Sequence, residues 1–480
     1  MRSDGALLVG PKPMKPMHTS IVPLTGSVGG FLRAAVLTLA VTSFTLAPSA
    51  FADERSITES RRVASSLAPA DPAKPDEKSN ALHAGEPLKK GIEYLLHQQQ
   101  PDGGWGQGGG WRQNLAKGGG RVEGKDVEDP SDLGNTAVSF VTLLRAGYSP
   151  VAGERREAMA KAFDFICRYI EKADDESLFV TPVRDTQLQP KIGLYVDTFL
   201  TGWALSEAKG KVGDAVAEKR RAAALDKVVK KIEKHQKDDG SFAGNAGWAA
   251  VLSQGLCSKA LNGAARSGAN VSKAVLDKDQ KQNLAGLDLK KGGFTATTGV
   301  TSGVAAAEPS SAGVSLYREG AKLGGLWENN ESNKTRRIDA EKVIADPAAP
   351  APKKAEARAE LKKADEDQQA AQVALKAVAG KLGDAGFVAG FGNNGGEEFL
   401  SYLNVSESMK AQGGKEWDGW KPKMIATVTG AQNADGSWAG HHCITGRTFC
   451  TSAALLTLLV DRAPAATTSV ASPNSETAKR

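Results

Sequence analysis

Apolar residues recur at helical spacing along much of the chain, and each such stretch ends at a cluster of turn-forming residues. Ile92, Leu95 and Leu96 form one stripe, which stops at Pro101-Asp102-Gly103-Gly104. Proline removes a backbone donor and glycine admits left-handed conformations, so this helix must end there. A second, more apolar helix is predicted for residues 132–148. Together the two helices predict an αα-hairpin as the structural unit.

The same unit returns twice further along the chain. Each copy has a Gln three residues before an Asp-Gly pair and an aromatic residue three residues after the Asp. The Gln and the aromatic residue of the three turns are Gln99 and Trp105, Gln236 and Phe242, and Gln432 and Trp438. A repeated turn between two helical periods is typical of a chain built from stacked helical hairpins.

Weaker copies of the hairpin are predicted between the clear ones. Their second helices are expected at residues 194–208, 311–323 and within 386–413. With the three clear copies they make about six hairpins, and six hairpins are enough to close a ring of paired helices. We therefore predict an all-α fold, an α/α toroid of about six helical hairpins, over residues 87–462.

Two charged stretches do not fit the repeat. Residues 271–291 are predicted to be an insertion. Residues 329–378 pass through a Pro/Ala-rich segment into a helix rich in Lys, Glu, Ala and Gln, which predicts a solvated helical insertion. A coiled-coil surface for a partner is the alternative, although the apolar positions of this helix are mostly alanine.

The beginning of the chain has the layout of an export signal. An apolar run over residues 34–46 follows Arg33 and leads to Ala50-Phe51-Ala52, which fits a small-residue cleavage site. The run is too short to span a bilayer comfortably, although an uncleaved anchor is the alternative. We predict a signal peptide (1–52), a disordered leader (53–86), a disordered tail (463–480) and an exported protein that is not integral to a membrane after cleavage: periplasmic, secreted or in the cell envelope.

The composition adds limits to this picture. Hydrophobic residues make up 40% and charged residues 24% of the chain, as in an ordinary globular protein. The formal net charge is +6, but residues 1–52 hold four basic residues and one acidic residue, so the remainder gives no argument for nucleic acid. The 4 cysteines permit two disulfides, and the sequence does not choose a pairing.

The three Gln-x-x-Asp-Gly-[Gly/Ser]-[Trp/Phe] turns resemble those of the prenyltransferase and squalene/hopene-cyclase repeat superfamily. The resemblance extends from about residue 88 to 460 and implies inner and outer helices around a central cavity. It also implies that the Gln and the aromatic residue of each turn brace one repeat against the next. The function that it implies is to hold a hydrophobic, isoprenoid-like ligand in the cavity.

The catalytic motifs of that superfamily are missing from this chain. It contains no Asp-x-Asp-Asp tetrad, no Asp-x-Cys pair for zinc and no Gly-Cys-Gly-Glu-Gln thioester. The sequence therefore leaves open whether the protein is an enzyme. The alternative function is a non-catalytic envelope scaffold that holds a partner protein. A polysaccharide lyase ranks third, because the tyrosines do not cluster with histidine along the chain.

The most conspicuous polar cluster is His441-His442-Cys443, in a chain with only 6 histidines. Imidazole and thiolate are good zinc ligands, so these three residues are candidate metal ligands. Adjacent histidines seldom hold an ion alone, and a further ligand is expected from another repeat. The residues that could supply it are Asp132, Asp197, Glu397 and Glu398. The alternative is a helix N-terminus whose polar groups satisfy backbone donors.

The candidates for catalysis are His441, His442, Asp197, Arg447 and Glu397. Asp197 interrupts an apolar helix and is a candidate general acid. Arg447 could face an anionic ligand or form an ion pair with Glu397 or its neighbour Glu398. These two carboxylates begin a helix, where acids are favourable, and we expect only one of them to face the cavity because neighbours on a helix point about 100° apart.

Overall fold

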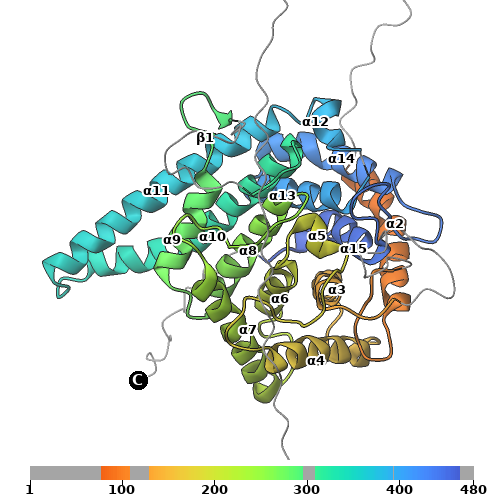
Figure 1. The fold of residues 1–480 in the computed structure, drawn as a ribbon. Helices are drawn as coiled ribbons and strands as arrows, with labels where there is room; N and C mark the ends of the chain where they lie inside the picture. The colour runs from red at the N-terminus through yellow and green to blue at the C-terminus, as the bar shows by residue number, and fades with distance from the viewer. Residues whose placement is uncertain (1–76, 109–128, 296–308, 393, 465–480) are drawn as a thin grey trace, which may run out of the picture. The chain divides into compact units, whose positions relative to one another are not determined.

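The computed structural model describes residues 77–108, 129–295, 309–392 and 394–464, and most of them are helical (Figure 1). The all-α prediction is confirmed. The first helices are α2 (Glu77–Gln98), α3 (Leu133–Ala146), α4 (Arg156–Lys172), α5 (Leu188–Ile192), α6 (Val196–Glu207), α7 (Ala215–His235), α8 (Ala250–Arg266) and α9 (Lys273–Leu284). They are followed by α10 (Ser315–Ala345), α11 (Ala351–Ala379), α12 (Ala385–Ala389), α13 (Gly396–Gln412), α14 (Gly414–Gly430), α15 (Arg447–Leu458) and the 3-10 helix η2 (Val460–Arg462).

The remaining regular element is a pair of short antiparallel strands, β1 (Leu287–Asp288) and β2 (Gly293–Phe294). The predicted signal peptide lies outside the described residues, as does most of the predicted leader and tail. Helix α2 begins at Glu77, inside the stretch predicted as leader, and continues through Pro87. Within the described ranges no helix is both long and apolar enough to cross a membrane. No disulfide links the four cysteines, all of which the structure describes.

Six helices, which we call the buried helices, contact one another in a cyclic order. Helix α3 contacts α6, and the order continues through α8, α10, α13 and α15 back to α3. Neighbours run in the same direction. Gly134 lies beside Asp197 near the N-terminal ends of α3 and α6, and Arg145 pairs with Glu207 near their C-terminal ends.

The other neighbouring pairs follow the same rule, since contacts early in one helix fall early in the next. Between α6 and α8 the contacts are Gly202 with Ala260 and Ser206 with Gly263, and between α8 and α10 they are Gly255 with Ala321 and Arg266 with Ser332. Between α10 and α13 they are Tyr317 with Glu398 and Gly324 with Asn404, and between α13 and α15 they are Gly396 with Phe449 and Phe399 with Thr457. Between α3 and α15, or the 3-10 helix η2 that follows it, they are Ser139 with Ser452 and Ala146 with Arg462. The six buried helices are therefore parallel.

A second set of helices, which we call the covering helices, lies against the buried ones. Helix α4 contacts α3, α7 contacts α6, α9 contacts α8, α11 contacts α10 and α14 contacts α13. Helix α2 contacts α15, so the beginning of the described chain packs against its end. Each covering helix carries the chain back along the previous buried helix, which allows the next buried helix to start at the same end.

Small residues let the buried helices approach closely. A Cβ atom at Gly202 would lie 2.9 Å from the Cβ of Ala260, so α6 and α8 meet where neither has a larger side chain. Hydroxyl groups on these helices bond back to their own backbone. Thr142, for example, donates to the carbonyl of Val138 at 2.7 Å, which satisfies a polar group inside an apolar interface.

Two of the three repeated turns brace neighbouring covering helices. Gln99 donates to the carbonyl of Gly103 in its own turn and to that of Ala158 in α4, at 2.9 and 2.8 Å. Gln432 makes the matching bonds to Gly436 and to Pro87 in α2, at 2.9 and 2.8 Å.

The indole N–H groups of these two turns also match, because Trp105 donates to Leu95 and Trp438 donates to Val428, both at 2.7 Å. The turn at Gln236 differs. The side chain of Gln236 is buried but makes no hydrogen bond to any residue that the structure describes.

The glycine after the Asp in each turn is required by both backbone conformation and space. Gly103, Gly240 and Gly436 have φ values of 91°, 84° and 84°. A Cβ atom on any of them would lie 2.6 Å or less from a backbone carbonyl oxygen of the following covering helix, in Lys161, Lys278 or Lys90. The repeated glycine thus lies where each turn contacts the next covering helix.

The two stretches predicted as insertions belong to the covering set. Helix α9, from residues 271–291, contacts α8 and α10, and helix α11 contacts α10 and α13. Alanines on one side of α11, among them Ala364, Ala371 and Ala374, are buried, while its charged side faces solvent. The charged, solvent-facing side of α11 agrees with a solvated helix, while alanine at helical spacing on its other side allows close packing on α10. The C-terminal part of α10 and the N-terminal part of α11 together extend well beyond the other helices (Figure 1).

We predict that Gly103→Ala lowers the free energy of unfolding by about 2–4 kcal/mol, because it adds a collision with α4 to the cost of a left-handed alanine. The matched control is Gly153→Ala, since Gly153 has a φ of 90° and nothing within 4 Å of its Cβ position. It should lose only about 1 kcal/mol. Chemical denaturation measures both, and equal losses would show that the approach of α4 is not tight.

Candidate functional site

The residues singled out from the sequence lie at the N-terminal ends of the buried helices or in the loop before α15. Because these helices are parallel, the residues share one end of the helix set. Asp132 is the N-cap of α3, and Asp197 lies in the first turn of α6. Glu397 and Glu398 lie in the first turn of α13. The loop before α15 carries His441, His442 and Cys443, and Arg447 is the first residue of α15.

Three of these residues form a cluster, which we call the Glu397–Glu398–His442 cluster. One oxygen of each carboxylate and one ring nitrogen of the histidine all lie within 4.8 Å of one another. Both glutamate side chains are fully buried, and the His442 side chain is 16% exposed. The sequence predicted that only one of the two glutamates would face the cavity; in the structure the loop that carries His442 lies close to both carboxylates.

Each carboxylate has one oxygen held by protein donors. Glu398 Oε1 accepts from the backbone N–H of Phe391 at 2.9 Å and from the hydroxyl of Tyr317. Glu397 Oε2 accepts from the backbone N–H of Ile444 at 3.1 Å. The other oxygens, Glu397 Oε1 and Glu398 Oε2, and both ring nitrogens of His442 have no hydrogen-bond partner among the described residues. Four polar atoms of the cluster are thus left without a hydrogen bond, which is costly for buried groups.

Two glycines hold the loop before α13 against the imidazole. A Cβ atom at Gly392 would lie 2.8 Å from His442 Cδ2, and one at Gly395 would lie 2.8 Å from His442 Cε1 and 2.7 Å from Glu398 Oε2. The ring of Phe391 packs edge-on against the imidazole, with centroids 5.1 Å apart. The glycine-rich stretch therefore fixes the position of the histidine ring.

Gln187, which the sequence analysis did not single out, fixes the loop that carries His442. Its side chain donates to the carbonyl of Cys443 at 3.0 Å and accepts from the N–H of Gly446 at 2.7 Å. Cys443 has a φ of 50°, an uncommon conformation for a residue with a side chain, and these bonds help to maintain it. Gln187 and Tyr317 carry no local motif, so only the fold could identify them.

The other two members of the predicted metal set lie outside the cluster. His441 is exposed, and its backbone N–H donates to the carbonyl of Asn394 at 2.9 Å. Burial, and then the carboxylate of Glu397, raise the pKa of the Cys443 thiol to about 12. Among the described residues, it is the ligand atoms of Glu397, Glu398 and His442 that lie within 4.8 Å of one another. The structure thus favours Glu397 and Glu398 over His441 and Cys443 as companions of His442.

Asp132 and Asp197 form a separate acidic pair at the same end of the buried helices. Burial, and then the charge of Asp197, raise the pKa of Asp132 to about 7. Burial also raises the pKa of Asp197. Each acid has a partner, since Asp132 accepts from the N–H of Asn135 at 2.8 Å and Asp197 from the amide of Gln189 at 2.7 Å. Both oxygens of Asp132 accept a hydrogen bond from Asn135, whereas Asp197 Oδ1 is buried and has no hydrogen-bond partner among the described residues. The general-acid role of Asp197 stays a prediction.

Arg447 points to the repeat turn. Its guanidinium lies 2.8 Å from the carboxylate of Asp435, the Asp of the third turn. The ion pair with Glu397 or Glu398 that the sequence allowed is therefore not formed. Arg447 helps to fix the start of α15 against that turn, and its role toward an anionic ligand stays a prediction.

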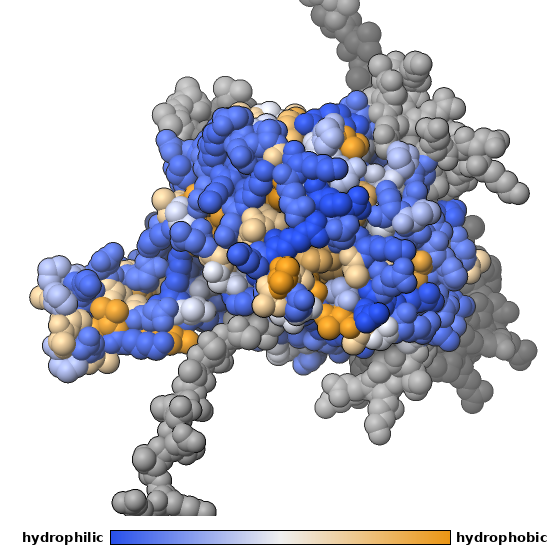
Figure 2. All heavy atoms as spheres, turned by 90° about the horizontal axis from the view of Figure 1, so that it is seen from below, coloured by the Kyte–Doolittle hydropathy of each residue, from blue (hydrophilic) through white to orange (hydrophobic). Residues whose placement is uncertain are grey.

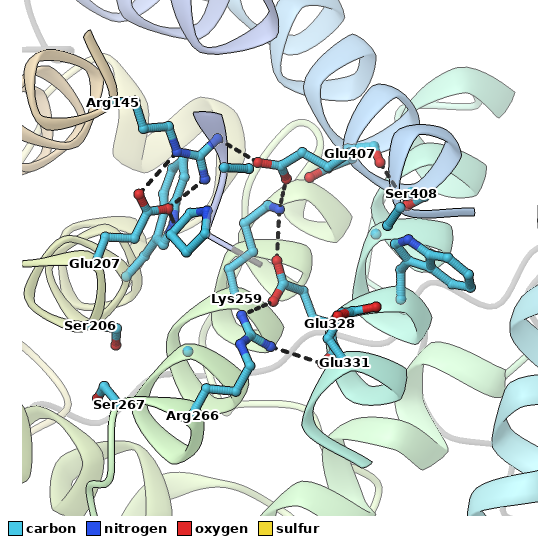
Figure 3. Close-up of a pocket in the computed structure, with 18 of the residues that line it drawn as sticks. Arg145, Ser206, Glu207, Lys259, Arg266, Ser267, Glu328, Glu331, Glu407 and Ser408 are labelled. Carbon is cyan, nitrogen blue, oxygen red and sulfur yellow. Dashed lines mark hydrogen bonds and ion pairs between the residues drawn. The ribbon is translucent and has the colours of Figure 1, made fainter. Parts of the chain in front are cut away.

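A cavity of about 510 Å³ lies at the opposite end, between the C-terminal parts of the buried helices (Figure 3). Its charged side chains alternate in sign and form a continuous chain of ion pairs. The pairs are Glu207 with Arg145, Arg145 with Glu407, Glu407 with Lys259, Lys259 with Glu328, and Glu328 with Arg266. Burial disfavours the charge on Glu407, but Lys259 and Arg145 outweigh it and lower the pKa of this carboxyl to about 2.

No family model matches the chain, and no curated protein matches it. The assignment of a function therefore rests on the residues and geometry of the two ends of the buried helices.

We predict that the stability of the protein falls as pH rises from about 4.5 to 8, and that Glu397 causes part of this loss. Burial, followed by the charge of Glu398, raises the pKa of Glu397 to about 8. In this window the folded chain keeps a proton that the unfolded chain releases, so a raised carboxyl pKa costs stability as pH increases. The cost of this group is about 4 kcal/mol larger at pH 8.5 than at pH 5.

Denaturant unfolding at pH 5 and pH 8.5 in the presence of chelator measures the effect. Glu397→Gln should lessen the pH dependence by that amount, whereas Glu154→Gln, at a side chain that is 84% exposed, should leave it unchanged. The same pH dependence in the wild type and Glu397→Gln would contradict the assignment.

Proposed function

We propose that the buried helices form the inner wall, and the covering helices the outer wall, of an α/α toroid like those of the prenyltransferase and squalene/hopene-cyclase superfamily. Three observations support this proposal. The buried helices contact one another in a cyclic order, they run parallel, and α2 packs against α15 so that the first and last repeats meet. The bracing bonds of Gln99 and Gln432 are those that the resemblance implies.

We further propose that this ring is a small-molecule-binding protein, and that its ligand enters the cavity at the C-terminal ends of the buried helices. The volume of about 510 Å³ carries this proposal, since sites for small ligands typically measure about 300–1,000 Å³. Export through the predicted signal peptide would give the protein access to ligands outside the cytoplasm. An enzymatic role is not part of the proposal.

The lining refines the ligand class that the sequence suggested. A purely hydrophobic ligand would meet the chain of ion pairs, whereas Lys209 and Lys211 at the rim make no ion pair in the described part of the chain. Trp327 offers an apolar ring, and its indole N–H has no hydrogen-bond partner among the described residues. These groups favour an amphiphile with an apolar body and an anionic head, such as a carboxylate or phosphate.

A second candidate function is the envelope scaffold, and the extended ends of α10 and α11 favour it (Figure 1). Hydrophilic residues cover most of the face in Figure 2, and hydrophobic residues gather on part of this extension. A partner protein would have access to it from several sides. The polysaccharide-lyase alternative loses support, because Tyr317 reaches the cluster of His442 but is fully buried instead of lining an open groove.

We predict that dodecanoate and dodecyl phosphate bind the purified full-length protein and that dodecanol binds at least about tenfold more weakly, because only the anions can pair with the rim lysines. Lys209→Glu combined with Lys211→Glu should weaken binding of the anions by at least about tenfold. Isothermal titration calorimetry measures these affinities, and native mass spectrometry detects a copurified ligand.

The matched control combines Lys219→Glu with Lys230→Glu on the exposed side of α7, which changes the net charge equally. The control should bind the anions like the wild type. If both double variants bind the anions equally weakly, the loss of affinity is due to net charge and not to the rim lysines. If dodecanol binds as tightly as the anions, the ligand is purely hydrophobic.

A further inference from the structure

We propose that Glu397, Glu398 and His442 bind one zinc ion at the N-terminal end of the buried helices. This site is separate from the ligand cavity and does not depend on the function proposed for it. The proposed ligands do not form the Asp-x-Cys pair that binds zinc in the superfamily that the turns resemble.

The spacing of the three side chains fits a shared ion better than direct hydrogen bonds. His442 Nε2 lies 3.5 Å from Glu398 Oε2, which is longer than the usual 2.7–3.2 Å of a hydrogen bond. Two ligands of a tetrahedral zinc ion, each bound at about 2.1 Å, lie about 3.4 Å apart. All three ligand atoms lie within 4.8 Å of one another, so movements of about 1 Å would complete the geometry.

Each carboxylate is oriented as a ligand that binds through one oxygen. Glu398 Oε1 is held by Tyr317 and Phe391, and Glu397 Oε2 is held by the N–H of Ile444. The remaining oxygens, Glu397 Oε1 and Glu398 Oε2, have no hydrogen-bond partner in the ranges that the structure describes. Donors to the outer oxygen of a carboxylate are the usual way in which proteins orient metal ligands.

The charge of the cluster also calls for a cation. Two adjacent carboxylates are fully buried, and neither forms an ion pair with Lys or Arg in the described part of the chain. A zinc ion would balance both negative charges.

The ligand types favour zinc over magnesium. Magnesium prefers an octahedral set of oxygens with several waters, whereas zinc accepts one imidazole and two carboxylates with a fourth position left for water or substrate. The glycines at 392 and 395 leave just enough room for the imidazole, which fixes its ring beside Glu398. Partial exposure of His442 gives the ion a path from solvent.

Titration of metal-free full-length protein with ZnCl2 tests the site. We expect one zinc ion per chain, lost in His442→Ala and Glu398→Gln and retained in the matched control His441→Ala, which removes the neighbouring exposed imidazole. Cys443→Ser should also keep the ion. An equal concentration of MgCl2 should not compete, because magnesium is poorly suited to an imidazole ligand.

Tyr317 provides a second variant that keeps all three ligands. It is a positioning residue, because its hydroxyl acts on the ion only through Glu398. Tyr317→Phe should lower the zinc affinity about 10- to 100-fold and retain a stoichiometry of about one, as expected for a group that orients a ligand. A role limited to packing would leave the affinity unchanged.

Two results would overturn the site. One is that the folded wild-type protein binds no zinc, and the other is that His442→Ala and Glu398→Gln bind zinc as fully as the wild type. The cobalt-substituted wild type gives an independent result if those variants fail to fold. We expect the visible bands of cobalt with nitrogen and oxygen ligands. An intense near-ultraviolet band from a thiolate ligand would place the ion on Cys443 and contradict the proposal.

Discussion

The parallel direction of the six buried helices determines where polar chemistry occurs in this protein. Each helix carries about half a positive charge at its N-terminus and about half a negative charge at its C-terminus. Parallel packing adds these partial charges at the two ends of the set. Asp132, Asp197 and the two adjacent glutamates lie at the N-terminal end, and the basic residues of the cavity lie near the C-terminal end. The two ends therefore offer different chemistry, with acids at one and a cation-rich cavity at the other.

This arrangement depends on the connections between the helices. Parallel neighbours require the chain to return along each buried helix, and the covering helices provide that return. The Asp-Gly turn sets how closely each covering helix approaches, because the glycine lies against a backbone carbonyl of the next one. At Gln99 and Gln432 a side-chain amide bonds both sides of this contact. The residues that repeat in the sequence are thus those that join the repeats.

The sequence predicted most of the helices but few of the contacts between residues that are far apart along the chain. The helices at 194–208 and 386–413 follow from apolar periodicity and are present as α6 and α13. The covering role of α11 was missed, because alanine and charge give no clear apolar stripe. His442 was a candidate from the start, but Tyr317 reaches it only through Glu398 and has no motif of its own. Which of two adjacent histidines turns inward depends on the backbone beside Cys443, which sequence spacing does not specify.

Glu397 and Glu398 on α13 and His442 in the loop before α15 come from two different repeats, and we propose that they bind one zinc ion at the acidic end of the buried helices. Crystals of the wild-type protein grown with zinc test it most directly, through anomalous difference maps from data collected on both sides of the zinc absorption edge. We predict one strong peak within about 2.2 Å of one oxygen of Glu397, one oxygen of Glu398 and one ring nitrogen of His442. A well-ordered cluster without a peak, or a peak on His441 and Cys443 instead, would contradict the account.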